Sequence, residues 1–307
     1  MSQAITFKNR VWENAGLLLF PDNFDEKKTY PAIISIHPIG SCKEQTSSNV
    51  YGKALAAAGF VVLAIDAAFQ GESGGEPRFI EDPYERVEDI RCAVDYLVTL
   101  PYVEENRIGI LGICGGGAYA LNAAMTERRL KAVVSITGVN FGRLLRDGFA
   151  GGTPVESLEA VAKQRTAEAR GAALFVNNML PASVEDGKKA GIEDIDVLEA
   201  TDYYKTPRGR QPNGATSVLF SRLSTGLGWD AFHLAEVLLT QPILVVVGDK
   251  PGGFGAYRDG FEIVRRAKSE KKELLAVKGQ SHYDLYDKPE AVSQALEKAI
   301  PFFREHL

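Results

Sequence analysis

The chain of 307 residues has few cysteines and few histidines. Its three cysteines, Cys42, Cys92 and Cys114, are odd in number and irregularly spaced, which argues against a disulfide framework and against a four-ligand zinc site. The four histidines are scattered and lack the i, i+4 pair typical of metal ligands on a helix. We therefore expect no metal and no cofactor. One of the cysteines could still act as a single reactive thiol.

The sequence also lacks an excess of basic residues and long apolar segments. The net charge is −5 and charges of both signs are interspersed, so no basic surface is evident that would neutralise nucleic-acid phosphates. No window approaches the ~20 apolar residues of a membrane span, and the opening "MSQAITFKNR" lacks the apolar core of a signal peptide. We expect a cytoplasmic protein that binds neither nucleic acid nor membrane, with a homodimer as one option for its oligomeric state.

Short apolar runs alternate with segments of helical period, which is typical of an α/β protein. Two runs near the N-terminus, at 5–9 and 16–20, predict an antiparallel hairpin. Continuous Val/Ile/Leu runs predict buried parallel strands at 32–37, 60–66, 108–113, 131–137, 242–249 and 273–279. Helices are predicted at 50–59, 84–100, 115–126, 257–269 and 289–307. This order predicts a mostly parallel central sheet flanked by helices.

The alternation stops between the strands at 131–137 and 242–249. Here the sequence predicts helices at 155–171 and 194–204 and loops at 147–154 and 206–217, with no convincing buried strand. We divide the chain into core segments 1–138 and 231–307 and a helical cap insertion, 139–230. Since α/β proteins bind ligands at the carboxyl edge of the sheet, the cap is expected to cover a pocket there, rather than only apolar surface. The predicted lining residues from the cap are Phe175, Met179, Tyr204 and Trp229.

The stretch "GICGG" at 112–116 lies between a predicted strand and a predicted helix. It fits the small-x-nucleophile-x-small pattern of a nucleophile elbow, in which the apex residue has strained backbone angles and its neighbours two positions away must be small. The pattern favours Cys114 as a nucleophile, with the N–H of Gly115 directed at a developing oxyanion. The alternative is a small core cysteine among glycines that only permit close packing.

A cysteine nucleophile needs a base, and His282 in "VKGQSHYDLYD" follows the last predicted strand. The third member of a triad is expected after "ILVVVG", where Asp249 is the candidate. Asp259 and Asp284 are alternatives. A two-residue Cys–His site is another, since a thiolate needs less assistance than a serine hydroxyl.

Two loops are expected to complete the rim of the site. In "HPIGSCKEQTS" (37–47), the N–H of Ile39 or Gly40 is the expected second oxyanion donor. His37, at the end of its strand, is expected to brace this loop. The segment "DAAFQGESGGEPR" (66–78) would bring Phe69 and Glu72 to the substrate, although a plain glycine-built turn is the simpler interpretation.

Five stretches together resemble a known group: "HPIGSCKEQTS", "DAAFQGESGGEPR", "RVEDIRCAVDYL", "YVEENRIGILGICGGG" and "GQSHYDLYD". They are similar to the α/β-hydrolases that include fungal polyketide transferases and their bacterial homologues, which are themselves similar to dienelactone hydrolases. The resemblance covers 32–138 and 241–307. It implies an α/β-hydrolase fold and acyl transfer through an acyl-enzyme to water or an alcohol.

Carried over by position, the resemblance implies Cys114 as nucleophile, His282 as base, and the N–H groups of Gly115 and of Ile39 or Gly40 as the oxyanion hole. The acid of the family falls in "DKPGG", where this chain departs from the pattern, so Asp249 is the weakest assignment. The cap insertion is also long compared with that of dienelactone hydrolase.

The expected function is hydrolysis of a small ester, thioester or lactone through a cysteine acyl-enzyme. The first alternative is an acyltransferase that moves an acyl or polyketide group from a thioester, with an acyl carrier or an alcohol acceptor as partner. The second is a binding module that retains the hydrolase scaffold without turnover.

Overall fold

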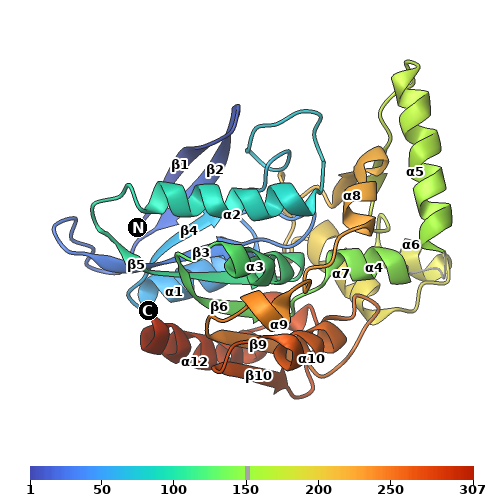
Figure 1. Cartoon of the computed structure of the whole chain (residues 1–307). Helices are drawn as coiled ribbons and strands as arrows, with labels where there is room; N and C mark the ends of the chain where they lie inside the picture. The colour runs from blue at the N-terminus through green and yellow to red at the C-terminus, as the bar shows by residue number, and fades with distance from the viewer. Residues whose placement is uncertain (149–152) are drawn as a thin grey trace.

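The computed structural model describes residues 1–148 and 153–307 and is built on a central sheet of eight strands (Figure 1). The spatial order is β1-β2-β4-β3-β5-β6-β9-β10; β1 and β2 pair in antiparallel fashion, β2 joins β4 in the same way, and the remaining neighbours are parallel. The predicted α/β-hydrolase fold class is confirmed. The bounds are β1 (Ser2–Asn9), β2 (Trp12–Leu19), β3 (Tyr30–Ile36), β4 (Val61–Ile65), β5 (Val103–Ile113), β6 (Leu130–Ile136), β9 (Ile243–Gly248) and β10 (Lys272–Val277).

Helices cover both faces of this sheet, which explains why its inner strands are continuous apolar runs rather than alternating ones. Every residue of β4 and of β9 is buried. Side chains from α2 (Pro83–Leu97), α3 (Gly115–Thr126) and α10 (Ala256–Arg266) pack on one face. Those from α1 (Lys53–Ala57) and α12 (Pro289–His306) pack on the other, and a π-helical segment at Ser47–Gly52 precedes α1.

The chain between β6 and β9 forms a cap that gathers at one end of the sheet, with α5 projecting from it (Figure 1). The predicted absence of a buried strand here is wrong: β7 and β8 form an antiparallel pair, and β8 is fully buried. Three-residue strands are too short for a periodicity to reveal them. The predicted loop 147–154 falls partly on 149–152, outside the described residues. The cap elements are α4 (Phe141–Asp147), α5 (Pro154–Ala169), β7 (Val176–Asn178), α6 (Val184–Lys189), α7 (Ile195–Lys205), β8 (Ser217–Leu219), the 3-10 turn Phe220–Arg222 and α8 (Ser224–Leu227). The short helix α9 (Ala235–Leu238) follows the cap and packs in the core.

Charged side chains of the cap hold it against the core. Arg208 makes a bidentate ion pair with Asp287, at 2.9 and 2.7 Å, and also donates to the carbonyl of Tyr283 at 2.9 Å. Such paired guanidinium–carboxylate bonds fix orientation as well as distance. They attach the cap to α11 (Asp284–Asp287), the short helix that follows β10. None of the described helices is long and apolar enough to cross a membrane.

Close packing at the end of β5 predicts that Gly112→Ala destabilises the fold. A Cβ at this position would fall on the carbonyl oxygen of Gly116, inside van der Waals contact with backbone that cannot rotate away. We expect the free energy of unfolding, measured with urea, to fall by at least about 2 kcal/mol. Gly228→Ala is the matched control, because its φ is −83° and the nearest atom to a new Cβ lies at 3.8 Å. A stability of Gly112→Ala equal to that of the control would contradict the packing described here.

Candidate active site

Cys114 occupies the apex of a sharp turn between β5 and α3. Its backbone has φ 55° and ψ −127°, a strained conformation for a residue with a side chain. Hydrogen bonds hold it there: the Cys114 N–H donates to the carbonyl of Ile136 at 3.0 Å, and its own carbonyl accepts from Gly117 at 2.9 Å. The predicted elbow geometry is therefore present, with the sulfur at the carboxyl edge of the sheet.

Gly112 and Gly116, two positions before and after Cys114, are glycines for a steric reason. A Cβ at Gly116 would lie 2.6 Å from the carbonyl oxygen of Ile36 and 2.7 Å from that of His37. At Gly112 it would overlap the backbone of Gly116. Strand and helix thus approach more closely than any side chain allows.

His282 follows β10 and is buried beside this turn. Its Nδ1 lies 2.8 Å from the hydroxyl of Thr137, the residue after β6, and its Nε2 lies 3.4 Å from the hydroxyl of Tyr286. Burial lowers the pKa of His282 to about 3, so its imidazole is neutral at physiological pH. For Nε2 to accept a proton, the ring must carry its hydrogen on Nδ1 and donate it to Thr137.

No carboxylate among the described residues is hydrogen bonded to His282. Asp249 is exposed, and its Oδ1 accepts from the N–H of Gly279 at 2.6 Å. Asp259 is buried in an ion pair with Arg143 at 2.7 Å. Asp284 accepts from the N–H of Ser281 at 2.8 Å. The acid predicted at Asp249, like its two alternatives, is thus not brought to the histidine, and Thr137 occupies the position where an acid would bind.

Tyr286 links the nucleophile candidate to the histidine. Its ring is fully buried, and its hydroxyl is a hydrogen-bonding neighbour of the Cys114 thiol as well as of His282 Nε2. The hydroxyls of Tyr204 and Tyr283 lie close to the same point. Burial raises the pKa of Tyr286 well above its ordinary value, so the hydroxyl keeps its proton at neutral pH.

The environment of Cys114 keeps its thiol protonated at neutral pH. Burial raises its pKa to about 11, while the hydroxyl of Tyr286 and the N–H of Gly115 act in the opposite direction. The Gly115 N–H, at the N-terminus of α3, is the first predicted oxyanion donor and points at the sulfur.

The loop after β3 lies beside the elbow, where a second oxyanion donor was expected. The Ile39 side chain covers Gly115, since a Cβ there would lie 2.5 Å from Ile39 Cγ1. Gly40 has φ 65° and its carbonyl accepts from Thr216 of the cap at 2.9 Å. His37 braces this loop as predicted, with Nδ1 2.6 Å from the carbonyl of Pro38 and Nε2 3.0 Å from the N–H of Ala67.

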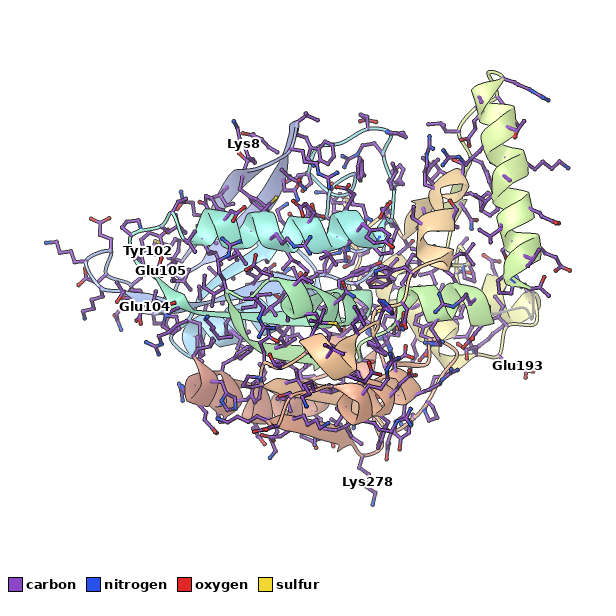
Figure 2. The ribbon with its side chains drawn as sticks, in the orientation of Figure 1. Lys8, Tyr102, Glu104, Glu105, Glu193 and Lys278 are labelled. Carbon is purple, nitrogen blue, oxygen red and sulfur yellow. The ribbon has the colours of Figure 1, made fainter. Side chains whose placement is uncertain are left out.

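A cavity of about 580 Å³ opens above Cys114, between the core and the cap. Two charged residues, Glu193 and Asp194, line it, and the side chain of Glu193 projects outward from the cap in Figure 2. The remaining walls are mainly apolar and aromatic. They include the predicted Ile39, Met179 and Tyr204, together with Phe141, Leu144, Leu145, Leu180, Pro181, Ile192, Val197, Val218, Leu223, Phe254, Tyr283 and Tyr286.

Four predicted substrate-binding residues do not line this cavity. Phe69 packs on Trp12, with ring centroids 5.1 Å apart. Phe175 is 49% exposed on the outside of the cap. Trp229 is buried against Tyr119 in the core, because apolar bulk alone does not distinguish a pocket wall from a packed interior.

Glu72 is the fourth. It belongs to a cluster with Glu44 and Asp66, the one group of described residues with metal-ligand spacing. The ammonium of Lys43 lies 2.6, 2.8 and 2.6 Å from the carboxylates of Glu44, Asp66 and Glu72. The lysine occupies the centre of the cluster and pairs with all three carboxylates, so the group fits a structural role.

Comparison with known proteins agrees with this geometry. Residues 15–164 match the dienelactone hydrolase family. The chain is 39% identical over 297 residues to the protein YcjY of Escherichia coli K12, covering 95% of this chain and 94% of the relative. The chain belongs to the dienelactone hydrolase family. It is an α/β-hydrolase enzyme, and the resemblance inferred from the five sequence stretches is confirmed.

Two further relatives of this dienelactone hydrolase family member show how far the likeness extends. The crystal structure of protein PA2218 from Pseudomonas aeruginosa has a TM-score of 0.89 and 32% identity, covering 100% of this chain and 94% of that one. The polyketide transferase claH of Penicillium crustosum is 26% identical over 200 residues, 62% of this chain and 61% of the relative.

Thr137 and Tyr286 are the site residues that sequence reasoning missed. Tyr286 stands four positions after His282 in "SHYDLYD", so its closeness in sequence to the histidine was a usable signal. Thr137 gave none, because it enters the site only through the pairing of β6 with β9, where its N–H donates to Val246 at 2.6 Å.

The shifts of Cys114 and His282 predict a neutral resting pair. A thiol pKa near 11 keeps Cys114 protonated, and an imidazole pKa near 3 keeps His282 uncharged, across the range between. The ultraviolet absorbance of thiolate, taken as the difference between wild type and Cys114→Ser, should therefore stay constant from about pH 5 to about pH 9. A step in this range would reveal a thiolate–imidazolium pair and contradict the neutral site.

Proposed function

We propose that this enzyme cleaves an ester, thioester or lactone through a covalent acyl-enzyme on Cys114, with His282 as the base. The observation that carries the proposal is the position of the Cys114 sulfur: it stands on a nucleophile elbow at the floor of a cavity, with a buried neutral imidazole close by. Thr137 acts as a positioning residue, since its hydroxyl holds His282 Nδ1 at 2.8 Å.

The reaction would proceed in two stages. The thiol proton passes to His282 Nε2 as the sulfur attacks the carbonyl carbon, and the oxyanion is stabilised by the N–H of Gly115 and by one from Ile39 or Gly40. Collapse of the tetrahedral intermediate expels an alcohol or a thiol, which takes the proton from His282 as it leaves, so the imidazole is neutral again. Water then attacks the thioester, His282 accepts its proton, and the acid is released with the thiol restored.

The cavity supports an uncharged acyl group as substrate. Among the described lining residues the charged ones are Glu193 and Asp194, and no lysine or arginine faces the cavity to pair with a carboxylate. Burying an unpaired anion against such walls is costly. An acyl part with its own carboxylate, as a dienelactone has, is therefore disfavoured, in line with the length of the cap.

Acyl transfer to an alcohol is the second candidate function, because the relative claH is named a polyketide transferase. It uses the same acyl-enzyme and differs in the acceptor alone. An apolar, capped cavity favours an alcohol over water to the extent that it stays dry.

Acyl-enzyme formation is the first test of this proposal. With p-nitrophenyl butyrate or a butyryl thioester, intact-mass analysis should show one butyryl adduct, and Cys114→Ala should show neither adduct nor turnover above background. An added alcohol competes with water for the acyl-enzyme. If more ester than acid forms, the result favours acyl transfer over hydrolysis. Folded protein without adduct or Cys114-dependent turnover would support a binding module and overturn the enzymatic proposal.

The role of Thr137 predicts a contrast between two variants. Thr137→Val removes the hydroxyl that orients His282 and should lower kcat/KM for p-nitrophenyl butyrate by about tenfold to a hundredfold. Asp249→Asn keeps an acceptor oxygen for Gly279, and Asp249 makes no hydrogen bond to His282, so kcat/KM of this variant should stay within about twofold. A large loss of activity in Asp249→Asn with little change in Thr137→Val would instead assign Asp249 as the acid. Thermal unfolding of both variants controls for stability.

A further inference from the structure

We propose that the hydroxyl of Tyr286 is the proton relay between Cys114 and His282. This inference rests on the proposed function and adds a catalytic residue to it. Its basis is the place of one phenol oxygen, which neighbours the nucleophile candidate on one side and the base on the other.

The histidine has one nitrogen left for catalysis, and that nitrogen faces the tyrosine. Nδ1 is engaged by Thr137 at 2.8 Å, and Nε2 is 3.4 Å from the Tyr286 hydroxyl. Across the described parts of the chain, no hydrogen bond joins the Cys114 thiol directly to His282. The histidine is also absent from the cavity wall, where Cys114 and Tyr286 both appear.

Tyr286 is fixed in this place from three directions. Its ring packs on those of Tyr283, with centroids 4.4 Å apart, and Tyr203, at 5.1 Å. Its carbonyl accepts from the Thr46 hydroxyl at 2.8 Å. A side chain held in this way cannot swing aside to let His282 reach the sulfur, so the proton path runs through its oxygen.

The relay moves two protons and leaves the tyrosine unchanged. The thiol proton passes to the phenol oxygen while the phenol proton passes to His282 Nε2, which yields thiolate, neutral tyrosine and imidazolium. The transfer is concerted, because the raised pKa of Tyr286 makes a free tyrosinate a costly intermediate. On deacylation the same path runs in reverse.

Alkylation of Cys114 by iodoacetamide tests this step without a substrate. The reaction needs the thiolate and develops no oxyanion, so it separates a relay from an oxyanion donor. At neutral pH, peptide mass spectrometry should show that Tyr286→Phe lowers the rate at Cys114 by about tenfold or more. His282→Gln should lower it to a similar level. The double variant should be no slower than either single one, because both residues serve one transfer.

Controls come from the same chain. Cys92 is a free, half-buried thiol on α2 that does not line the cavity, and its alkylation rate should be equal in all variants. Tyr203→Phe removes a hydroxyl from the same aromatic cluster without touching Cys114, so its rate at Cys114 should match wild type. Thermal unfolding of each variant verifies that the ring packing is retained.

Three outcomes would overturn the relay. Alkylation of Tyr286→Phe at the wild-type rate, with ester turnover reduced, would make the hydroxyl an oxyanion donor. Wild-type rates of both alkylation and ester turnover in Tyr286→Phe would show that the hydroxyl has no catalytic role. A double variant slowed by the product of the single effects would mean independent action, as for a simple hydrogen bond to the thiolate. Failure of the proposed function is distinct: it would appear as no effect of His282→Gln on alkylation, or no acyl adduct in wild type.

Discussion

The hydrogen bond between Thr137 and His282 determines the electrostatics of the whole site. A carboxylate in the place of Thr137 would stabilise imidazolium and raise the pKa of the histidine, and it would draw the thiol towards a thiolate–imidazolium pair. A hydroxyl orients the ring without adding charge, so the buried histidine stays neutral and the buried thiol stays protonated. The site thus avoids the desolvation cost of a buried ion pair until a substrate supplies an electrophile.

The neutral resting state is consistent with the aromatic surroundings. The ring of His282 is in contact with Phe254, Tyr283 and Tyr286, at centroid distances of 5.5, 5.0 and 5.4 Å. These rings surround the imidazole with apolar surface, which accounts for the burial that keeps the base uncharged. Because the cap is tied to α11 by Arg208 and Asp287, its position and that of Tyr286 are set together. The cavity above Cys114 and the proton path below it are therefore parts of one packed unit.

Whether a feature could be predicted from the sequence depends on how far apart in the sequence the interacting residues lie. The elbow is local: Gly112, Cys114 and Gly116 meet within five residues, and the steric reason for the glycines is visible in the pattern. His282 was found because its place after the last strand follows from topology. Thr137 was missed, because it reaches His282 across 145 residues and carries no signal of its own. Pocket residues such as Trp229 and Phe175 were misplaced, since apolar character does not say which side of the cap a side chain occupies.

The segment "DKPGG" shows why the expected acid is missing from the site. In this chain the cap uses that segment as its docking point: the N–H of Gly253 donates to Asp194 at 2.7 Å and that of Phe254 to Asp196 at 2.9 Å. The carboxyl of Asp196 lies against Gly252, where any Cβ would collide with it. A glycine there is thus a requirement of cap docking, and its backbone leaves no side chain to reach His282. The segment that was expected to supply an acid therefore anchors the cap, and the group that holds His282 is the hydroxyl of Thr137.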